Sequence, residues 1–409
     1  YSGKRPRSFL LPAVLAGRDD GNGSISDTEG QSMATITYLT KIQFDFGAVQ
    51  LLAAEMAELG MTRPLLVTDK GVRAAGLLDR VMAHLAKGCQ AEIFDATPEN
   101  PTEAAMTAAL AQFRAAGCDG LIGIGGGSSM DLAKAIALMA THPGELSEYM
   151  MILGGAPKIT AAIAPVIAVP TTAGTGSEVG RGAIMILNDG RKLGFGSPHV
   201  IPKVALCDPE LTFSMPTMLT AGTGMDAFAH CFETFCASAV NPPADAIAMD
   251  GLGRAVRFIE RAVADGDDRE ARWQMMMASM EGAMAFQKGL GAVHGMSHPL
   301  GSLKDPILHH GTLNAVCLPP VIRYNADAVG DKYDRVKQIW GLPADADLAD
   351  EVAALNQRLG LPASLREMGV DEAMIEPLIP HAVADHTTAT NPRPLTADDY
   401  RALFLETLG

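Results

Sequence analysis

The sequence predicts an α/β domain with a mostly parallel sheet, followed by an all-helical domain. From residue 36 to about residue 209, short runs rich in β-branched residues alternate with alanine-rich stretches. Strands and helices that alternate at this spacing are typical of βαβ units. After residue 209 strand-like runs nearly disappear, and long Ala-, Met- and Leu-rich segments of helical period follow. We therefore place the α/β domain at residues 33–209 and the helical domain at residues 210–409.

The first half supplies the predicted strands. Residues 64–69, 119–124 and 164–170 read PLLVTD, DGLIGI and APVIAVP, and each contains a short apolar run. Such runs, when bounded by turn residues, favour strands that are buried on both faces of a parallel sheet. Alanine-rich segments at residues 53–60 and 102–117 predict helices between these strands.

The second half supplies helices. Long segments at residues 218–239, 269–288 and 346–360 have apolar residues at helical spacing. Five methionines at positions 275–277, 280 and 284 favour core packing over a ligand surface, because the flexible thioether side chain fills irregular space.

Composition excludes several classes of protein. The 409 residues are 48% hydrophobic and 19% charged, which excludes a generally disordered chain. Lys and Arg number 32 against 47 Asp and Glu, and the net charge of −15 argues against binding to nucleic acid or an anionic membrane. No apolar run reaches the roughly 18 residues of a membrane span. Six scattered cysteines without a C-x-x-C pair match neither a disulfide framework nor a cysteine zinc site, so we expect a cytoplasmic protein.

The first 32 residues differ from the rest. They begin with a basic stretch, continue with a Gly/Ser/Asp-rich tract and are followed by Met33. We expect an N-terminal extension, disordered or derived from cloning, in preference to a secretory or transit signal.

A glycine-rich loop follows the predicted strand at residues 119–124. The segment DGLIGIGGGSSMDLAK (119–134) has the order strand, glycines, helix. Glycines let a phosphate oxygen approach backbone N–H groups at a helix N-terminus, so the segment predicts a pyrophosphate site. Tight packing of strand on helix is the alternative interpretation. The best acidic strand end, Asp69, precedes the glycines, whereas the standard dinucleotide fold places it about 20 residues after them. We therefore expect a Rossmann-like variant.

A second loop, VPTTAGTGSEVGRGA (169–183), concentrates small hydroxyl residues after an apolar run. Its hydroxyl groups could bind a sugar or a phosphate, which is weak evidence alone. Together with the glycine loop, it suggests the opposite wall of one crevice.

Histidines and one aspartate predict a metal site in the helical half. Asp226 and His230 lie four residues apart, as do His294 and His298, and a His-His pair follows at 309–310. On a helix this spacing places both side chains on one face. A carboxylate with several imidazoles is the ligand set of a first-row divalent ion, although a lone histidine would more often belong to the core.

Seven motifs in this order are similar to those of one known family. They are GGGSSMDLAK (125–134), PTTAGTGSEV (170–179), PHVIPKVALCDPELT (198–212), GMDAFAH (224–230), HGMSHPLG (294–301), HHGTLN (309–314) and NPRPLT (391–396). From about residue 36 onward, the chain resembles the iron-containing (group III) alcohol dehydrogenases. The resemblance implies a dehydroquinate synthase-like fold, in which a Rossmann-like NAD(P)-binding domain precedes an all-helical metal-binding domain.

The resemblance also implies roles for individual residues. It implies the metal ligands Asp226, His230, His294 and His310, for Fe²⁺ or alternatively Zn²⁺, and a catalytic, proton-relaying His298. Asp69 would face the adenosine ribose and favour NAD over NADP. The other implied cofactor-binding residues are Gly125, Gly126, Gly127, Ser128, Thr171, Thr172, Thr175 and Lys192.

The implied reaction is hydride transfer between NAD and a short alcohol or hydroxyacid, with an aldehyde or ketone as substrate in reverse, by a homodimer or higher homo-oligomer. A hydroxyacid–oxoacid transhydrogenase and a glycerol-dehydrogenase-like polyol oxidoreductase are the alternatives. Maleylacetate reductases, which lack the metal, dehydroquinate synthases, and a nucleotide-binding protein without catalysis fit less well. The substrate stays open: residues 150–155 and 304–309 are candidate pocket elements, and Lys304 and His309 could bind a substrate carboxylate, although we favour surface charge.

Overall fold

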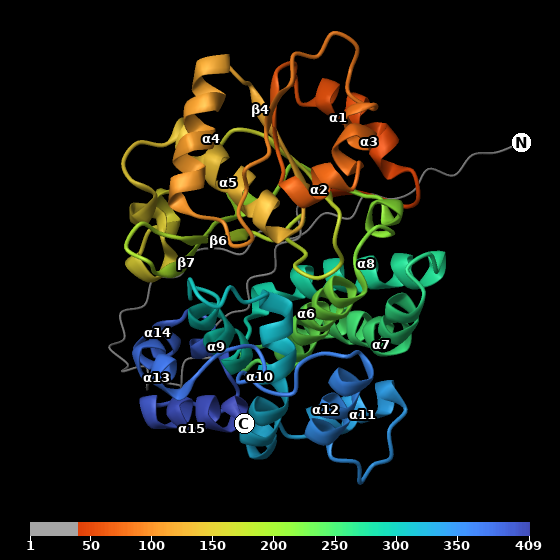
Figure 1. The fold of residues 1–409 in the computed structure, drawn as a ribbon, viewed down its shortest axis with the longest axis vertical. Helices are drawn as coiled ribbons and strands as arrows, with labels where there is room; N and C mark the ends of the chain where they lie inside the picture. The colour runs from red at the N-terminus through yellow and green to blue at the C-terminus, as the bar shows by residue number, and fades with distance from the viewer. Residues whose placement is uncertain (1–39) are drawn as a thin grey trace, which may run out of the picture. The chain divides into compact units, whose positions relative to one another are not determined.

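Six parallel strands form the main sheet, in the order β1-β8-β5-β4-β2-β3. β6 and β7 form a separate antiparallel hairpin, which Figure 1 labels. The computed structural model describes residues 40–409, so the predicted extension at residues 1–32 lies outside the described residues. The strands are β1 (Lys41–Phe44), β2 (Pro64–Val67), β3 (Glu92–Phe94), β4 (Gly120–Gly125), β5 (Val166–Pro170), β6 (Gly182–Ile186), β7 (Lys192–Gly196) and β8 (Val204–Cys207).

The three predicted strands are confirmed as β2, β4 and β5, at the centre of the sheet. Leu66, Ile122 and Ile167 lie in register across these strands, and all three side chains are buried. Successive residues along a strand point to opposite faces of a sheet, so a strand that is apolar throughout needs a cover on both faces.

Helices provide that cover. Leu65 and Leu121 pack with residues of α4 and α5 in one apolar cluster, whereas Leu66 and Ile122 pack with residues of α1 and α3 in another. Figure 1 shows these two helix pairs flanking the strands. The predicted helices at residues 53–60 and 102–117 are confirmed as α1 and α4. The helices of this half are α1 (Leu52–Glu58), α2 (Lys70–Ala74), α3 (Leu77–Met82), α4 (Glu103–Ala116) and α5 (Gly127–Thr141).

After β8 the regular structure of the described chain is helical, as predicted. Met275, Met276 and Met280 are buried in the core that α6, α7, α8 and α10 share, and Met277 and Met284 pack against it, which confirms their predicted role. The helices are α6 (Thr217–Cys236), α7 (Pro242–Ala264), α8 (Arg269–Ala285), α9 (Ala292–Leu300), α10 (His310–Asn325), α11 (Lys332–Trp340), α12 (Leu348–Arg358), α13 (Glu372–Ile375), α14 (Ile379–Ala384) and α15 (Ala397–Leu408). Within residues 40–409, no helix combines the length and the apolar character that crossing a membrane requires.

Candidate active site

A cavity of about 1350 Å³ is lined both by loops at the carboxyl ends of β2, β4 and β5 and by residues of α6, α9 and α10. This edge of an open parallel sheet is where ligands bind in doubly wound folds. Every predicted site residue lines the cavity except Gly125. Gly125 ends β4 with a φ of +147°, and a methyl group on it would lie 2.7 Å from the Ser129 hydroxyl oxygen, so only glycine fits there.

The glycine loop opens directly into α5. Gly127 is the first residue of this helix, and a methyl group placed on it would lie only 2.7 Å from Thr175 Cγ2. The missing side chain therefore keeps the space above the helix N-terminus open to a ligand. Backbone N–H groups and the macrodipole of this 15-residue helix favour an anion there. The Ser128 hydroxyl donates to the carbonyl of Glu99.

The threonine loop lies against the glycine loop, as the sequence suggests. The N–H of Thr171 donates to the carbonyl of Gly125 at 2.9 Å. Thr172 lies 3.4 Å from the position that a methyl group on Gly126 would occupy. Because Thr175 meets Gly127 in the same way, the two loops form adjoining walls of one crevice.

Asp69 lies at the carboxyl end of β2 and caps α2. Its Oδ1 accepts from the N–H of Val72 at 2.9 Å, and its Oδ2 lies 3.4 Å from the Ser129 hydroxyl. The same carboxylate therefore starts a helix and borders the cavity.

A buried pair that the sequence interpretation missed holds the threonine loop in place. Asp131 and Lys134, both on α5, bind the Ser177 hydroxyl at 2.6 and 2.8 Å. Lys134 also donates to the carbonyls of Gly180 and Gly182. The i,i+3 spacing of an acid and a lysine just after the glycines was the available signal.

Lys192 begins β7, and its Nζ donates to Asn100 Oδ1 at 2.9 Å. Burial lowers the pKa of Lys192 to about 8, although the Asp131 and Asp226 carboxylates favour its charged form. A lysine with this pKa is mostly charged at neutral pH.

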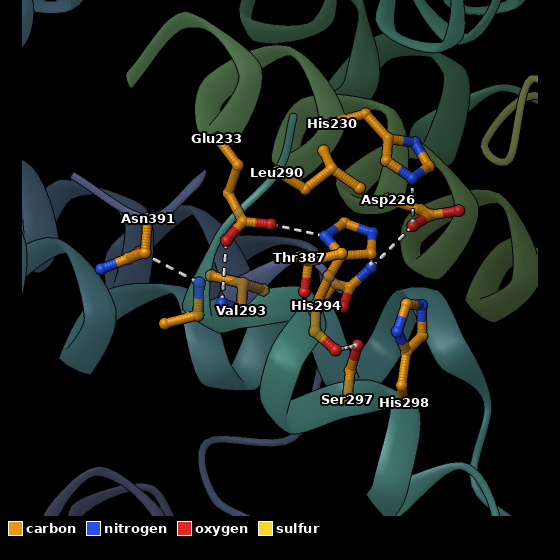
Figure 2. Close-up of polar contacts among 12 residues, drawn as sticks. Asp226, His230, Glu233, Leu290, Val293, His294, Ser297, His298, Thr387 and Asn391 are labelled. Atoms are coloured by element: carbon orange, nitrogen blue, oxygen red, sulfur yellow. Dashed lines mark hydrogen bonds and ion pairs between the residues drawn. The ribbon is translucent and has the colours of Figure 1, made fainter. Parts of the chain in front are cut away.

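The four predicted metal ligands lie where α6, α9 and α10 meet. Possible ligand atoms of Asp226, His230 and His294 lie within 4.8 Å of one another, and Figure 2 shows these three side chains. Asp226 Oδ1 lies 3.8 Å from His230 Nε2 and 3.7 Å from His310 Nε2. Asn314 Nδ2 donates to this oxygen at 2.7 Å and lies 3.2 Å from His294 Nε2 and 3.3 Å from His310 Nε2.

These residues fit a divalent metal ion. Ligand atoms at about 2.1 Å from an ion stand roughly 3.4 Å apart at a tetrahedral angle, close to the spacing observed. Burial and neighbouring positive groups lower the pKa of His294 and of His310 well below the usual value, so both imidazoles are neutral, as metal ligands must be. Asn314 Oδ1 and His310 Nδ1 are buried without a hydrogen-bond partner among the described residues. The cluster therefore contains buried polar atoms that no residue of the described chain binds.

Glu233, which the sequence interpretation did not identify, supports His294. Its carboxylate binds His294 Nδ1 at 2.5 Å and the N–H of Val293 at 2.8 Å, and Figure 2 shows Glu233 and Asp226 on opposite sides of the His294 ring. Burial raises the pKa of Glu233 to about 8, although the N–H of Val293 and the nearby His230 favour the carboxylate. A divalent ion bound to His294 would favour the carboxylate further, because it adds positive charge beside it. A carboxylate on Nδ1 leaves Nε2 free to bind a metal. The only signal for this role was its position on α6, three residues after His230.

His298 lies beside the metal-ligand cluster and has its own partner. Its Nδ1 pairs with Asp385 Oδ2 at 2.9 Å, and its ring stacks on those of His310 and His386. Burial opposes ionisation of Asp385, but the adjacent His298 lowers the pKa of Asp385 well below its usual range. Asp385 and His386 were missed because they lie almost 90 residues after His298.

The two candidates for binding a substrate carboxylate lie in different places. Lys304 is exposed and lies outside the cavity lining, in agreement with surface charge. His309 lines the cavity, but its Nδ1 accepts from the N–H of Thr312 and caps α10. Burial lowers the pKa of His309, so it presents no fixed positive charge. Of the other candidate segment, residues 150–155, Met151 contributes to the lining.

Comparison with known proteins agrees with this geometry. Residues 40–209 match the family model "iron-containing alcohol dehydrogenase", and residues 220–408 match the C-terminal model of the same family. The chain is 58% identical over 383 residues to a 4-hydroxybutyrate dehydrogenase of Cupriavidus necator, covering 92% of this chain and 100% of that protein. It is 34% identical to an NAD-dependent methanol dehydrogenase of Bacillus methanolicus, covering 88% of this chain and 96% of that protein. A crystal structure of 1,3-propanediol oxidoreductase superposes with a TM-score of 0.85 and 34% identity, over 92% of this chain and 100% of that one.

Proposed function

The chain belongs to the iron-containing alcohol dehydrogenase family and is an oxidoreductase that acts on CH–OH groups; from this premise we propose that it oxidises short alcohols and ω-hydroxyacids with NAD. The observation that supports this best is the single cavity that joins Asp226 and its three histidines to the open N-terminus of α5. Such a cavity brings an alcohol and a dinucleotide together. We propose 4-hydroxybutyrate as the first substrate to test, because the relative at 58% identity is a 4-hydroxybutyrate dehydrogenase.

The donor set supports a role for Asp226, His230, His294 and His310 as ligands of Fe²⁺ or Zn²⁺, since both ions accept oxygen and nitrogen ligands. An ion held by these residues would act as a Lewis acid toward the alcohol oxygen and lower the pKa of the hydroxyl. Glu233 orients His294, and the Asp226 carboxylate balances part of the added charge. The protein thus orients the ligand side chains and balances the charge of the ion.

His298 is our candidate for the catalytic proton acceptor. Asp385 accepts from Nδ1 at 2.9 Å, which leaves Nε2 with the lone pair that can take the alcohol proton. His298 lines the cavity beside the ligand cluster without belonging to it. His386, whose ring stacks on that of His298, also lines the cavity.

NAD would accept the hydride from the carbinol carbon. We propose that Gly125 shapes the loop and that Gly126, Gly127 and Ser128 hold the pyrophosphate at α5, with Thr171, Thr172 and Thr175 on the opposite wall. Asp69 would bind the ribose hydroxyls and repel a 2′-phosphate, and Lys192 would lie beside the nicotinamide half.

We further propose a nucleotide-binding domain at residues 33–209, a metal-binding domain at 210–409, and a homodimer or higher homo-oligomer. A cytoplasmic location is supported by the six cysteines, which are all unpaired.

The test is NAD reduction by protein reconstituted with Fe²⁺ or Zn²⁺, with 4-hydroxybutyrate, 1-butanol and 1,3-propanediol as substrates. We expect NADH release that depends on the added metal. Release that persists after complete removal of metal would contradict the assignment. Turnover that needs an added oxoacid and releases no NADH would instead identify a transhydrogenase.

A further inference from the structure

Arg181 is a cation of the cavity that has no acidic partner within the described residues. It directly precedes β6 and lines the same cavity as the metal-ligand cluster. Its guanidinium donates to the carbonyl of Gln287 at 3.2 Å. The Arg181 side chain is exposed at the wall of the cavity. Partial desolvation there lowers the pKa of Arg181, and no neighbouring carboxylate opposes this effect. Because a guanidinium keeps its charge at any physiological pH, the cavity contains a fixed positive charge that is not neutralised.

The other cations of the cavity are already engaged or lie at a different end. Lys288 forms an ion pair with Asp245 and donates to the carbonyl of Phe235. Lys192 donates to Asn100 and, unlike Arg181, also interacts electrostatically with the Asp131 and Asp226 carboxylates. Lys70 begins α2 next to Asp69, at the end proposed for the adenosine ribose. Arg181 is therefore the cavity cation most available to an incoming anion.

Phe286 contacts the metal-ligand cluster and also the segment that carries Arg181. The Phe286 ring packs edge-on against His230, with ring centroids 5.3 Å apart. Phe286 Cζ also lies 3.4 Å from the position of a methyl group on Gly180, the residue before Arg181. The carbonyl that Arg181 binds belongs to Gln287, the residue after Phe286. Phe286 is therefore an apolar side chain that links the ligand cluster to the segment that carries Arg181.

We propose that Arg181 binds the carboxylate of an ω-hydroxyacid whose hydroxyl end lies at the metal-ligand cluster and whose methylene chain lies along Phe286. The planar guanidinium matches a carboxylate in a two-point hydrogen bond. This inference rests on the proposed function and specifies its substrate. It assigns the carboxylate to Arg181 and not to Lys304 or His309.

The test compares two substrates that differ only at the far end, 4-hydroxybutyrate and 1,4-butanediol, in the metal-loaded enzyme. For Arg181→Gln we expect kcat/KM to fall roughly 10- to 100-fold with 4-hydroxybutyrate, as for loss of a hydrogen bond to a charged group. With 1,4-butanediol, kcat/KM should stay within about twofold, and KM for NAD should not change. Arg181→Lys should give an intermediate loss, because lysine keeps the positive charge but cannot form the planar two-point hydrogen bond of a guanidinium.

Arg191→Gln is the matched control. Arg191 lies in the same hairpin segment but pairs with Asp189 at 2.7 Å and does not line the cavity. We expect this variant to keep the wild-type ratio of kcat/KM between the two substrates. Equal losses on both substrates in Arg181→Gln, or a raised KM for NAD, would overturn the proposal and place Arg181 at the cofactor.

Saturation-transfer NMR can measure the binding of butyrate, and this readout does not need turnover. Wild type should bind butyrate and Arg181→Gln should bind it at least tenfold more weakly. Equal binding by the two proteins, or none by wild type, would overturn the role of Arg181. Normal butyrate binding without oxidation of any alcohol would instead refute the proposed function and leave the anion site intact.

Discussion

Replacing Glu233 by glutamine tests how the protein prepares His294 for a metal ion. The Glu233 carboxylate accepts two hydrogen bonds, from His294 Nδ1 at 2.5 Å and from the N–H of Val293 at 2.8 Å. A glutamine of the same shape has only one acceptor atom. If its oxygen faces Val293, its NH₂ group faces Nδ1 and forces the proton of His294 onto Nε2. Nε2 then cannot bind a metal.

The magnitude follows from these contacts. Loss of a group that orients a metal-binding histidine costs about 10- to 100-fold in metal affinity. This range corresponds to about 1.4–2.8 kcal/mol, close to the penalty for one buried donor left without a partner. We therefore expect the dissociation constant of Zn²⁺ to rise 10- to 100-fold in Glu233→Gln, whereas the metal-free protein should lose little stability because the replacement keeps volume and packing.

The assay is competition for Zn²⁺ with a chromogenic chelator, with urea unfolding of the metal-free protein beside it. Glu281→Gln is the control, because Glu281 is also largely buried but pairs with Arg254 at 3.2 Å on the outer helices α7 and α8. Unchanged Zn²⁺ affinity in Glu233→Gln, together with lower stability of the metal-free protein, would refute the reasoning and reduce Glu233 to a packing role.

Three further predictions concern the ligand cluster, the cofactor and pH. His310→Ala should lose metal and metal-dependent NADH release together; full turnover with unchanged metal content by elemental analysis would remove His310 from the ligand set. Asp69→Ser keeps an oxygen for the N–H of Val72, so stability should hold while the NADP/NAD ratio of kcat/KM rises at least about tenfold; an unchanged ratio would exclude Asp69 from cofactor choice. The pKa of Lys192 is about 8 in the folded protein, against 10.5 for a free lysine side chain. Between these pH values the unfolded chain binds more protons than the folded protein, so this residue makes stability rise with pH there. Below pH 8 we expect Lys192→Gln to be more stable than wild type, because it has no buried charge. In urea unfolding of the metal-free protein, this difference in the free energy of unfolding should shrink by roughly 1–3 kcal/mol between pH 8 and 10. A pH-independent difference would show that burial of Lys192 has no such effect.

Local patterns were sufficient for much of the fold. The apolar runs that became β2, β4 and β5 predicted the centre of the sheet, because only strands covered on both faces lack polar alternation. Spacing of four residues placed Asp226 and His230 on one face of α6, since both lie on the same helix. The pairing of Asp385 with His298, 87 residues apart, has no local pattern and could not be predicted.

By itself, the sequence determined the order of an α/β half before a helical half, the glycine loop and the residue types that converge as a metal-ligand set. These features depend on local periodicity, backbone freedom and donor chemistry, which short segments encode. Only the tertiary structure decided that Glu233 supports His294 and that Lys304 lies outside the cavity. It also decided that Arg181 reaches the cavity without an acidic partner among the described residues. Whether a charge is compensated depends on which distant segments fold against it, because electrostatic contacts act through space and not along the chain.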